Sequence, residues 1–214
     1  EEGEYYQGEY WVLMLTSLLG MMMMASSRDL VSIFVSLEFL SIPAYMLAAW
    51  RKRDSKSNEA GVKYFLLGVF ASAVMLYGMS LLYGVTNSTL LSDIANQVTG
   101  DLTAVRILAI VFIVVGFAFK VSAVPFHTWA PTGHSAAPTA ASMLLAGVVM
   151  KLGAYGCLRV AMTLFPVGLK MWQPEIAALA VTGIVYGALV ALVQKDFKFV
   201  IGYSSVSHMG FVLL

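Results

Sequence analysis

One acidic and two basic side chains stand inside long apolar stretches of this sequence. Glu38 and Lys151 lie near the middle of two such stretches, and Lys120 lies near the end of another, five residues before Pro125. A charge at mid-membrane depth costs about 2.5 to 3.5 kcal/mol on insertion scales, so it is rarely kept without a partner or a task. The affinity of a lysine for its proton responds strongly to burial and to a neighbouring carboxylate. We therefore interpret these residues as groups that take up and release protons within the bilayer.

Purely structural interpretations exist for some of these charges. Glu38 could belong to an ion pair or stay a neutral carboxyl. Lys120 is close to the end of its apolar stretch, and Lys63 opens another stretch directly after a basic loop. Either ammonium could therefore extend to the membrane surface while its stem stays in the apolar layer.

Lys151 is harder to explain in this way. Gly147 and Tyr155 lie one turn before and one turn after it, on the same helix face. The small residues Gly147, Gly153 and Gly156 permit close approach of a second helix. We therefore expect the Lys151 ammonium to lie inside a helix bundle rather than toward lipid.

Three histidines could connect the lysines. His127, His134 and His208 follow Lys120 along the chain, and a neutral imidazole both donates and accepts a proton near neutral pH. A buried histidine with satisfied hydrogen bonds is an alternative for His208. A metal site is a weak alternative, because the three lack Cys or Asp partners at ligand spacing.

The elements that must position these groups are membrane helices. The sequence is 59% hydrophobic and only 12% charged, and its mean hydropathy is +0.81. A helix needs about 20 apolar residues to cross the hydrocarbon layer. The sequence therefore predicts an all-α, polytopic transmembrane helix bundle with helices at 9–26, 30–49, 61–84, 104–124, 138–159, 174–194 and from 199 onward.

A broken helix is predicted after Lys120. Pro125, Pro131 and Pro138 fall among small and polar residues. Proline lacks a backbone donor and pushes the preceding residue out of helical geometry. Irregular backbone at membrane depth survives only where protein or a water-filled cavity surrounds it.

The positions of Lys and Arg predict the orientation. Basic residues cluster in the loops 51–56 and 195–198, which fall on one side of the membrane when the crossings are counted. The loops 85–103 and 160–173, which include Asp101, fall on the other side. Basic loops stay cytoplasmic. The acidic first residues, Glu1 to Glu4, would then be cytoplasmic too. Because the sequence starts without a methionine and ends within an apolar stretch, we expect it to be a piece of a longer protein.

Other chemistry is not indicated. The single cysteine, Cys157, can form neither an internal disulfide nor a thiolate cluster. No phosphate-binding glycine loop, iron–sulfur framework or nucleophile elbow is found, so we expect the chain to bind no redox cofactor and no metal. The net charge of +1, without a basic aromatic patch, gives no indication of nucleic-acid binding.

In combination, these motifs resemble the antiporter-like subunits of respiratory complex I, the NADH–quinone oxidoreductase. The resemblance covers most of the chain. Residues 30–84 look more like the N-type subunit and residues 125–214 more like the M-type, and the sequence does not decide between them. The stretches that carry this resemblance to the antiporter-like subunits are SLEFLSIP at 36–43, EAGVKYF at 59–65, FKVSAVPFHTW at 119–129, GHSAAPT at 133–139, Lys151, and YSSVSHMG at 203–210.

The resemblance implies an antiporter-like fold and a mechanism. Two inverted five-helix repeats, each with a broken helix, form this fold; residues 1–159 would be the first repeat (about the fourth to eighth helices of the family) and 160–214 the truncated start of the second. Matched motif by motif, Glu38 and Lys120 correspond to the family's Glu–Lys pair. Lys151 would pass the proton on, Lys63 would be a further lysine, and His134 and His208 would line the same axis.

The resemblance also implies a setting. Other membrane subunits of complex I would be the partners, together with lipid, in a bacterial inner membrane. Other subunits of the complex, rather than this chain, would bind NADH, FMN, iron–sulfur clusters and quinone. Two alternatives stay open: a subunit of a multi-subunit sodium–proton antiporter or of a related membrane-bound hydrogenase, and a membrane scaffold in which the charges are internal ion pairs. An excess of lysines over the single central Glu38 argues against the scaffold.

Overall fold

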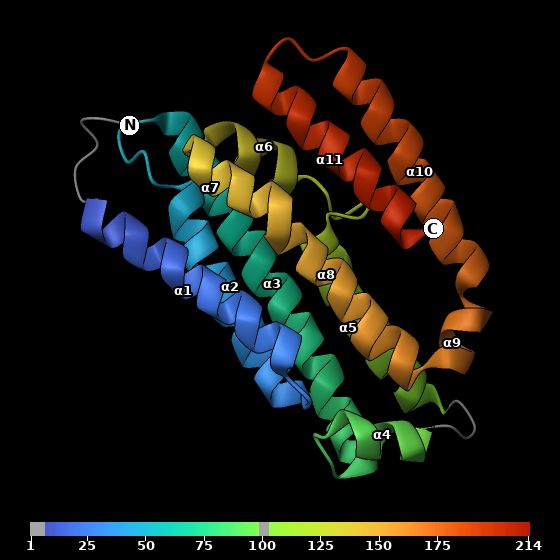
Figure 1. The fold of residues 1–214 in the computed structure, drawn as a ribbon. Helices are drawn as coiled ribbons and strands as arrows, with labels where there is room; N and C mark the ends of the chain where they lie inside the picture. Colours follow the sequence, from blue (N-terminus) through green and yellow to red (C-terminus); the bar gives the residue numbers. More distant parts are fainter. Residues whose placement is uncertain (1–6, 99–102) are drawn as a thin grey trace.

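The computed structural model describes residues 7–98 and 103–214, and these residues form a bundle of helices (Figure 1). Within them no sheet strand occurs, and the one β-bridge, between Asp29 and Leu90, is isolated. The prediction of an all-α chain is thus confirmed. The elements in chain order are α1 (Gln7–Ser26), α2 (Leu30–Ala48), α3 (Ser55–Thr86), α4 (Leu91–Val98), α5 (Ala104–Val121), α6 (Trp129–Ala136), α7 (Thr139–Leu144), the π-helix η1 (Leu145–Val149), α8 (Met150–Gly156), the π-helix η2 (Cys157–Met162), α9 (Pro166–Met171), α10 (Gln173–Leu192) and α11 (Phe197–Leu213).

Six helical segments of the described chain are long and apolar enough to cross a membrane. They are α1, α2, α3, α5, the continuous helix from α7 to η2, and α10. The seventh predicted span corresponds to α11, which has 17 residues. Large apolar side chains on the outer faces are exposed, Phe70 and Leu192 among them. Such a surface suits hydrocarbon rather than water.

Polar caps explain where the helices begin. The Asp29 side chain accepts hydrogen bonds from the Ser32 backbone amide at 2.9 Å and from the Ser32 hydroxyl at 2.6 Å, which starts α2. Asp54 caps α3 in the same way, so α3 begins at Ser55, six residues before the predicted start. The apolar stretch alone could not show this polar first turn.

The predicted break after Lys120 is present. Helix α5 ends where Ser122 takes the left-handed conformation, with φ 62°. The peptide bond between Val124 and Pro125 is cis, and α6 begins only at Trp129. The Trp129 indole donates to the carbonyl of Phe119 at 2.8 Å across the gap, so the two halves of the broken helix are joined by a side chain.

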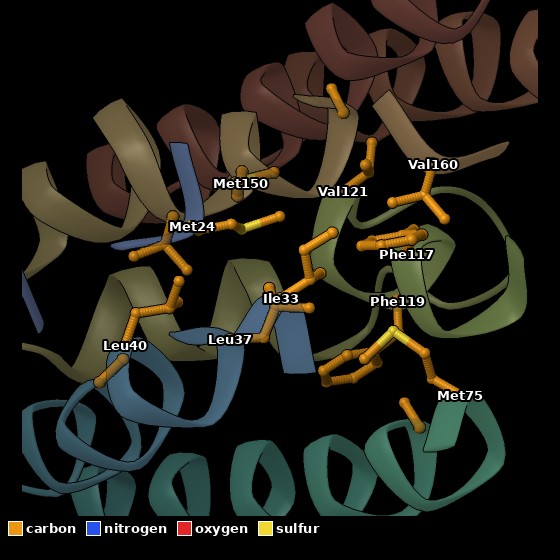
Figure 2. Close-up of a cluster of buried hydrophobic side chains, with 14 of the residues drawn as sticks. Met24, Ile33, Leu37, Leu40, Met75, Phe117, Phe119, Val121, Met150 and Val160 are labelled. Atoms are coloured by element: carbon orange, nitrogen blue, oxygen red, sulfur yellow. The ribbon is translucent and has the colours of Figure 1, made fainter. Parts of the chain in front are cut away.

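Helix packing buries the end of α5 and the start of α6 on the two sides of this break, whereas Pro125 and Phe126 within it are exposed. Helix α3 packs against α2, α5 and α6, and α8 packs against α5. Figure 2 shows part of the buried cluster, in which Ile33 and Leu37 of α2 meet Phe117 of α5 and Met150 of α8. In Figure 1 the α2–α3 and α10–α11 connections lie at one end of the bundle, while α4 and α9 lie at the other. This arrangement agrees with the predicted grouping of the loops, although Asp101 and Glu1 to Glu4 lie outside the described residues.

Candidate functional site

Lys120 is the most deeply buried charge of the described chain. Its side chain is 1% exposed. Its ammonium donates to Ser41 Oγ at 2.6 Å and to Tyr45 Oη at 3.2 Å, both on α2. The alternative in which Lys120 reaches the membrane surface is therefore wrong. Helix α5 ends one residue later, at Val121, so the buried ammonium lies beside the helix break.

An aromatic cage surrounds this ammonium. It lies 5.5 Å from the centroid of the Tyr45 ring and 5.7 Å from that of Phe119. Tyr45 meets Tyr64 edge to face at 4.5 Å, and Tyr64 stacks on Trp129 at 4.2 Å, with 3° between the planes. Aromatic faces attract a cation. The cage thus stabilises the charge of Lys120 without fixing it in an ion pair.

Glu38 lies close to Lys120 but does not contact it. Its carboxylate accepts a hydrogen bond from Ser72 Oγ of α3 at 2.5 Å. Among the described ion pairs none joins Glu38 to Lys120, although the carboxylate is near enough to act on the ammonium through space. Glu38 and Ser41 lie three residues apart on one face of α2. The two residues of the expected pair thus lie near each other without forming an ion pair.

Lys151 occupies a different place from the one expected. Its side chain is exposed in the described chain, and its ammonium donates to the carbonyl of Ala146 in η1 at 2.5 Å. A Cβ added to Gly153 would lie 2.7 Å from the backbone nitrogen of Val121, whereas one added to Gly147 would meet nothing within 4 Å. Gly153 therefore forms the contact with α5. Two residues turn a helix by about 200°, so that contact directs Lys151 to the other side.

His134 links the region of the break to Lys151. It lies on α6 and is 1% exposed. Its Nδ1 lies 3.5 Å from Ser142 Oγ of α7, and it is close enough to Lys151 for the two to interact electrostatically. The structure therefore brings His134 and Lys151 into one region, next to the one that holds Glu38 and Lys120.

The structure does not bring Lys63 and His208 into this group. Lys63 pairs with Glu59 at 2.5 Å, with side chains 51% and 64% exposed. His208 is exposed, and its Nδ1 lies 2.7 Å from the carbonyl of Ser204 in its own helix, so a fully buried His208 is not observed. His127 lies in the break, with its ring edge to face with Tyr186 of α10 at 5.1 Å.

Several buried polar atoms lie near the helix break. In the part of the chain that the structure describes, Tyr64 Oη, Ser122 Oγ and His134 Nε2 are buried without a protein partner. Buried polar groups are normally paired, either with protein or with ordered water. Ser122 and His134 lie on the two sides of the helix break, and Tyr64 stacks on Trp129 at the start of α6.

Ser41, Tyr45 and Ser72 contact the two charges directly, and none of the three was predicted from the sequence. A signal was available. Ser41 and Tyr45 follow Glu38 by three and seven residues, which is the spacing of one helix face. For Ser72, which lies on another helix, no such signal exists. The described residues contain no cluster of three His, Cys, Asp or Glu side chains that could hold a metal.

Comparison with known proteins supports the resemblance noted above. Subunit N of the NADH-quinone oxidoreductase from Rhizorhabdus wittichii is 40% identical over 211 residues, which are 99% of this chain and 44% of that protein. A chain of respiratory complex I from Thermus thermophilus matches with a TM-score of 0.80 and 37% identity over 95% of this chain and 44% of that one. A chain of the membrane-bound sulfane sulfur reductase, an archaeal respiratory membrane complex, matches with a TM-score of 0.90 and 30% identity over 96% of this chain and 42% of that one.

The sequence thus spans less than half the length of these relatives. A family model described as "NADH:quinone oxidoreductase/Mrp antiporter, TM" matches residues 27–214. Its match includes Glu38, Lys120 and Lys151, together with the helix break. The chain belongs to this transmembrane family of NADH:quinone oxidoreductase and Mrp antiporter subunits.

Proposed function

We propose that this chain translocates protons as part of an N-type subunit of a bacterial NADH–quinone oxidoreductase. The observation that carries the proposal is the burial of the Lys120 ammonium at a helix break, among neutral hydroxyls and rings, with Glu38 nearby but parted. A lysine held by neutral partners can lose its proton, because no ion pair is broken when it does so.

The geometry suggests the order of events. When Glu38 approaches Lys120, the carboxylate stabilises the ammonium and Lys120 keeps its proton. When Glu38 moves away to Ser72, that stabilisation falls, and the proton passes by way of water and His134 toward Lys151. Quinone reduction elsewhere in the complex would drive the movement of Glu38. A two-state element of this kind is what coupling over a distance requires.

A proton is the ion that suits these groups. An ammonium has three donors and no acceptor, so Lys120 cannot ligate a sodium ion. Its hydrogen bonds to Ser41 and Tyr45 are those of a proton donor. Hydroxyl oxygens alone, beside a cation, would be a poor sodium site.

The remaining parts of the proposal concern the whole complex. Other membrane subunits would cover faces of this chain. Subunits elsewhere in the complex would bind NADH, FMN, iron–sulfur clusters and quinone. The chain itself would bind no cofactor. Residues 1–159 would form the first five-helix repeat and 160–214 the start of the second. The N-type assignment rests on the subunit N relatives, such as that of Rhizorhabdus wittichii.

The test is proton pumping by the assembled complex in vesicles. Lys120→Met in the full-length subunit should abolish the proton gradient that this subunit contributes, since a thioether carries no exchangeable proton. Lys195→Ala, which removes an exposed lysine in the α10–α11 loop, is the control and should pump normally. Normal proton pumping by Lys120→Met would refute the proposal.

The two alternatives predict different results in the same vesicles. Sodium–proton exchange without any quinone reductase would favour the antiporter function that the family also contains. If Lys120 and Glu38 formed only a structural pair, replacing both by apolar residues of similar size would leave transport intact and stability unchanged or higher.

A further inference from the structure

The two charges of the site are each held by hydroxyl groups of other residues. Lys120 donates to Ser41 and Tyr45, and Glu38 accepts from Ser72. We propose that these three hydroxyls are positioning groups, which hold Glu38 and Lys120 apart and set the pH at which Lys120 releases its proton. This inference rests on the proposed function, and it identifies the hydroxyl groups that would control when Lys120 releases its proton.

Ser41 is oriented to accept from the ammonium. Its side chain is fully buried, and its hydroxyl donates to the carbonyl of Leu37 one turn earlier in α2. A hydroxyl has one proton to donate and two lone pairs. With its proton committed to Leu37, Ser41 presents lone pairs to Lys120, at 2.6 Å. It therefore stabilises the charged form of the lysine and gives much less to the neutral form.

Tyr45 provides a second acceptor, and its position is fixed by its neighbours. Its ring packs edge to face on Tyr64 and Phe65. A Cβ added to Gly68 of α3 would overlap the Tyr45 hydroxyl, so the glycine makes the space that this hydroxyl occupies. The ring cannot turn away from Lys120 without losing both aromatic contacts.

Ser72 acts on the opposite charge and from a different helix. It is buried on α3 and donates to the Glu38 carboxylate of α2 at 2.5 Å. Because α3 packs against both α2 and α5, a small shift of α3 relative to α2 would release Glu38 from Ser72. Glu38 would then be free to approach Lys120.

The hydroxyls on the two charges have opposite effects on proton release. The titratable groups that act on Lys120 are Glu38 and Tyr45 from α2. Tyr64 of α3 packs behind Tyr45, and α8 contributes the backbone at Gly153. Without Ser72, the state in which Glu38 is away from Lys120 is less stable, whether or not Lys120 is charged. The state in which Glu38 pairs with a charged Lys120 is therefore more populated. Without the acceptor at Ser41 or Tyr45, only one state is less stable, namely the state in which Lys120 is charged and Glu38 is away from it.

The experiment measures the pumping rate of the assembled complex against pH. Ser72→Ala should move the alkaline limb of the profile, where Lys120 no longer loads, to higher pH. Ser41→Ala should move the same limb to lower pH. A hydrogen bond to a charged group changes such an equilibrium by about tenfold or more, so each displacement should be about one pH unit. Tyr45→Phe, which keeps the ring, should move the limb in the same direction as Ser41→Ala and by less.

Matched serines provide the controls. Ser80→Ala removes an exposed hydroxyl of α3 that bonds only to its own helix, and Ser36→Ala removes a buried hydroxyl of α2 that does the same. Both should leave the alkaline limb in place. Ser41→Thr keeps the hydroxyl and should restore the parent profile, and Tyr45→Phe gives an independent result if the threonine does not fit.

The outcomes separate this inference from the proposed function. Opposite displacements for Ser72→Ala and Ser41→Ala support it. Displacements of the same sign, or lower rates with an unmoved limb, would show that the hydroxyls only help the helices to pack. If Lys120→Met pumps normally, the proposed function fails. If Lys120→Met is inactive while the profiles of Ser41→Ala, Tyr45→Phe and Ser72→Ala match the parent, only this inference fails.

Discussion

Gly153 is the position at which the smallest substitution should have a large effect. An added Cβ would lie 2.7 Å from the backbone nitrogen of Val121, and 2.8 and 2.9 Å from Cβ and C of Lys120. Ordinary van der Waals contact begins at 3.4 Å, so the methyl group is about 0.5 to 0.7 Å too close to atoms of the α5 backbone. Since backbone cannot rotate away as a side chain can, α5 and α8 must separate.

We therefore expect Gly153→Ala to destabilise the fold and to displace Lys120. Overpacking of this kind costs about 1–3 kcal/mol, partly offset by about 0.5–1 kcal/mol because alanine favours a helix over glycine. The net loss is then about 0 to 2.5 kcal/mol, and a loss near the middle of that range lowers the thermal midpoint by a few degrees. The assay is thermal unfolding of the full-length subunit in detergent, followed by proton pumping in vesicles.

Gly147→Ala is the matched control for this prediction. It lies six residues earlier in the same continuous helix, and an added Cβ there meets nothing within 4 Å. Its thermal midpoint should equal or exceed that of the parent, because only the helix preference remains. Equal midpoints for the two variants would show that the close contact between Gly153 and α5 does not limit stability.

Three further variants test separate parts of the structure. Hydrogen bonds from the Ser32 hydroxyl and backbone hold the pKa of Asp29 below its ordinary value. Asp29→Ala should therefore cost about 1 kcal/mol of stability at neutral pH. As the pH falls below about 4, the Asp29 carboxylate of the parent is protonated, and the thermal midpoints of the variant and the parent should approach each other. Trp129→Phe keeps an aromatic ring but loses the 2.8 Å bond to the Phe119 carbonyl and part of a buried indole that stacks on Tyr64, so unfolding in denaturant should show a loss of more than about 1 kcal/mol. Lys63→Ala removes an ion pair whose side chains are 51% and 64% exposed, and the thermal midpoint should stay within about 1 °C of the parent.

The sequence alone was sufficient for most of the fold. Apolar length predicted every long helix, and Pro125 predicted the break, because backbone chemistry at a proline is local. The predicted starts and ends were least accurate where a polar turn precedes the apolar stretch, as at Asp54. The short helices α4 and α9 were missed, since neither has an apolar stretch of membrane length.

The site was only partly predictable. A charge inside an apolar stretch is visible in the sequence, so Glu38, Lys120 and Lys151 could be chosen as candidates. The side of a helix that faces a partner is a property of packing. Gly147 and Gly153 look equivalent in the sequence, yet only Gly153 contacts α5, and this decides where Lys151 points. Ser72 is 34 residues from Glu38, and no local pattern joins them.

The proposed function requires Lys120 to release a proton and not merely to carry a positive charge. Lys120→Arg separates the two, because a guanidinium keeps its charge but does not give up its proton in a protein. The measurement is the pumping rate of the assembled complex carrying Lys120→Arg, with quinone reduction recorded in parallel to confirm assembly. We expect quinone reduction without the proton gradient that this subunit contributes, whereas pumping at the parent rate would contradict the account.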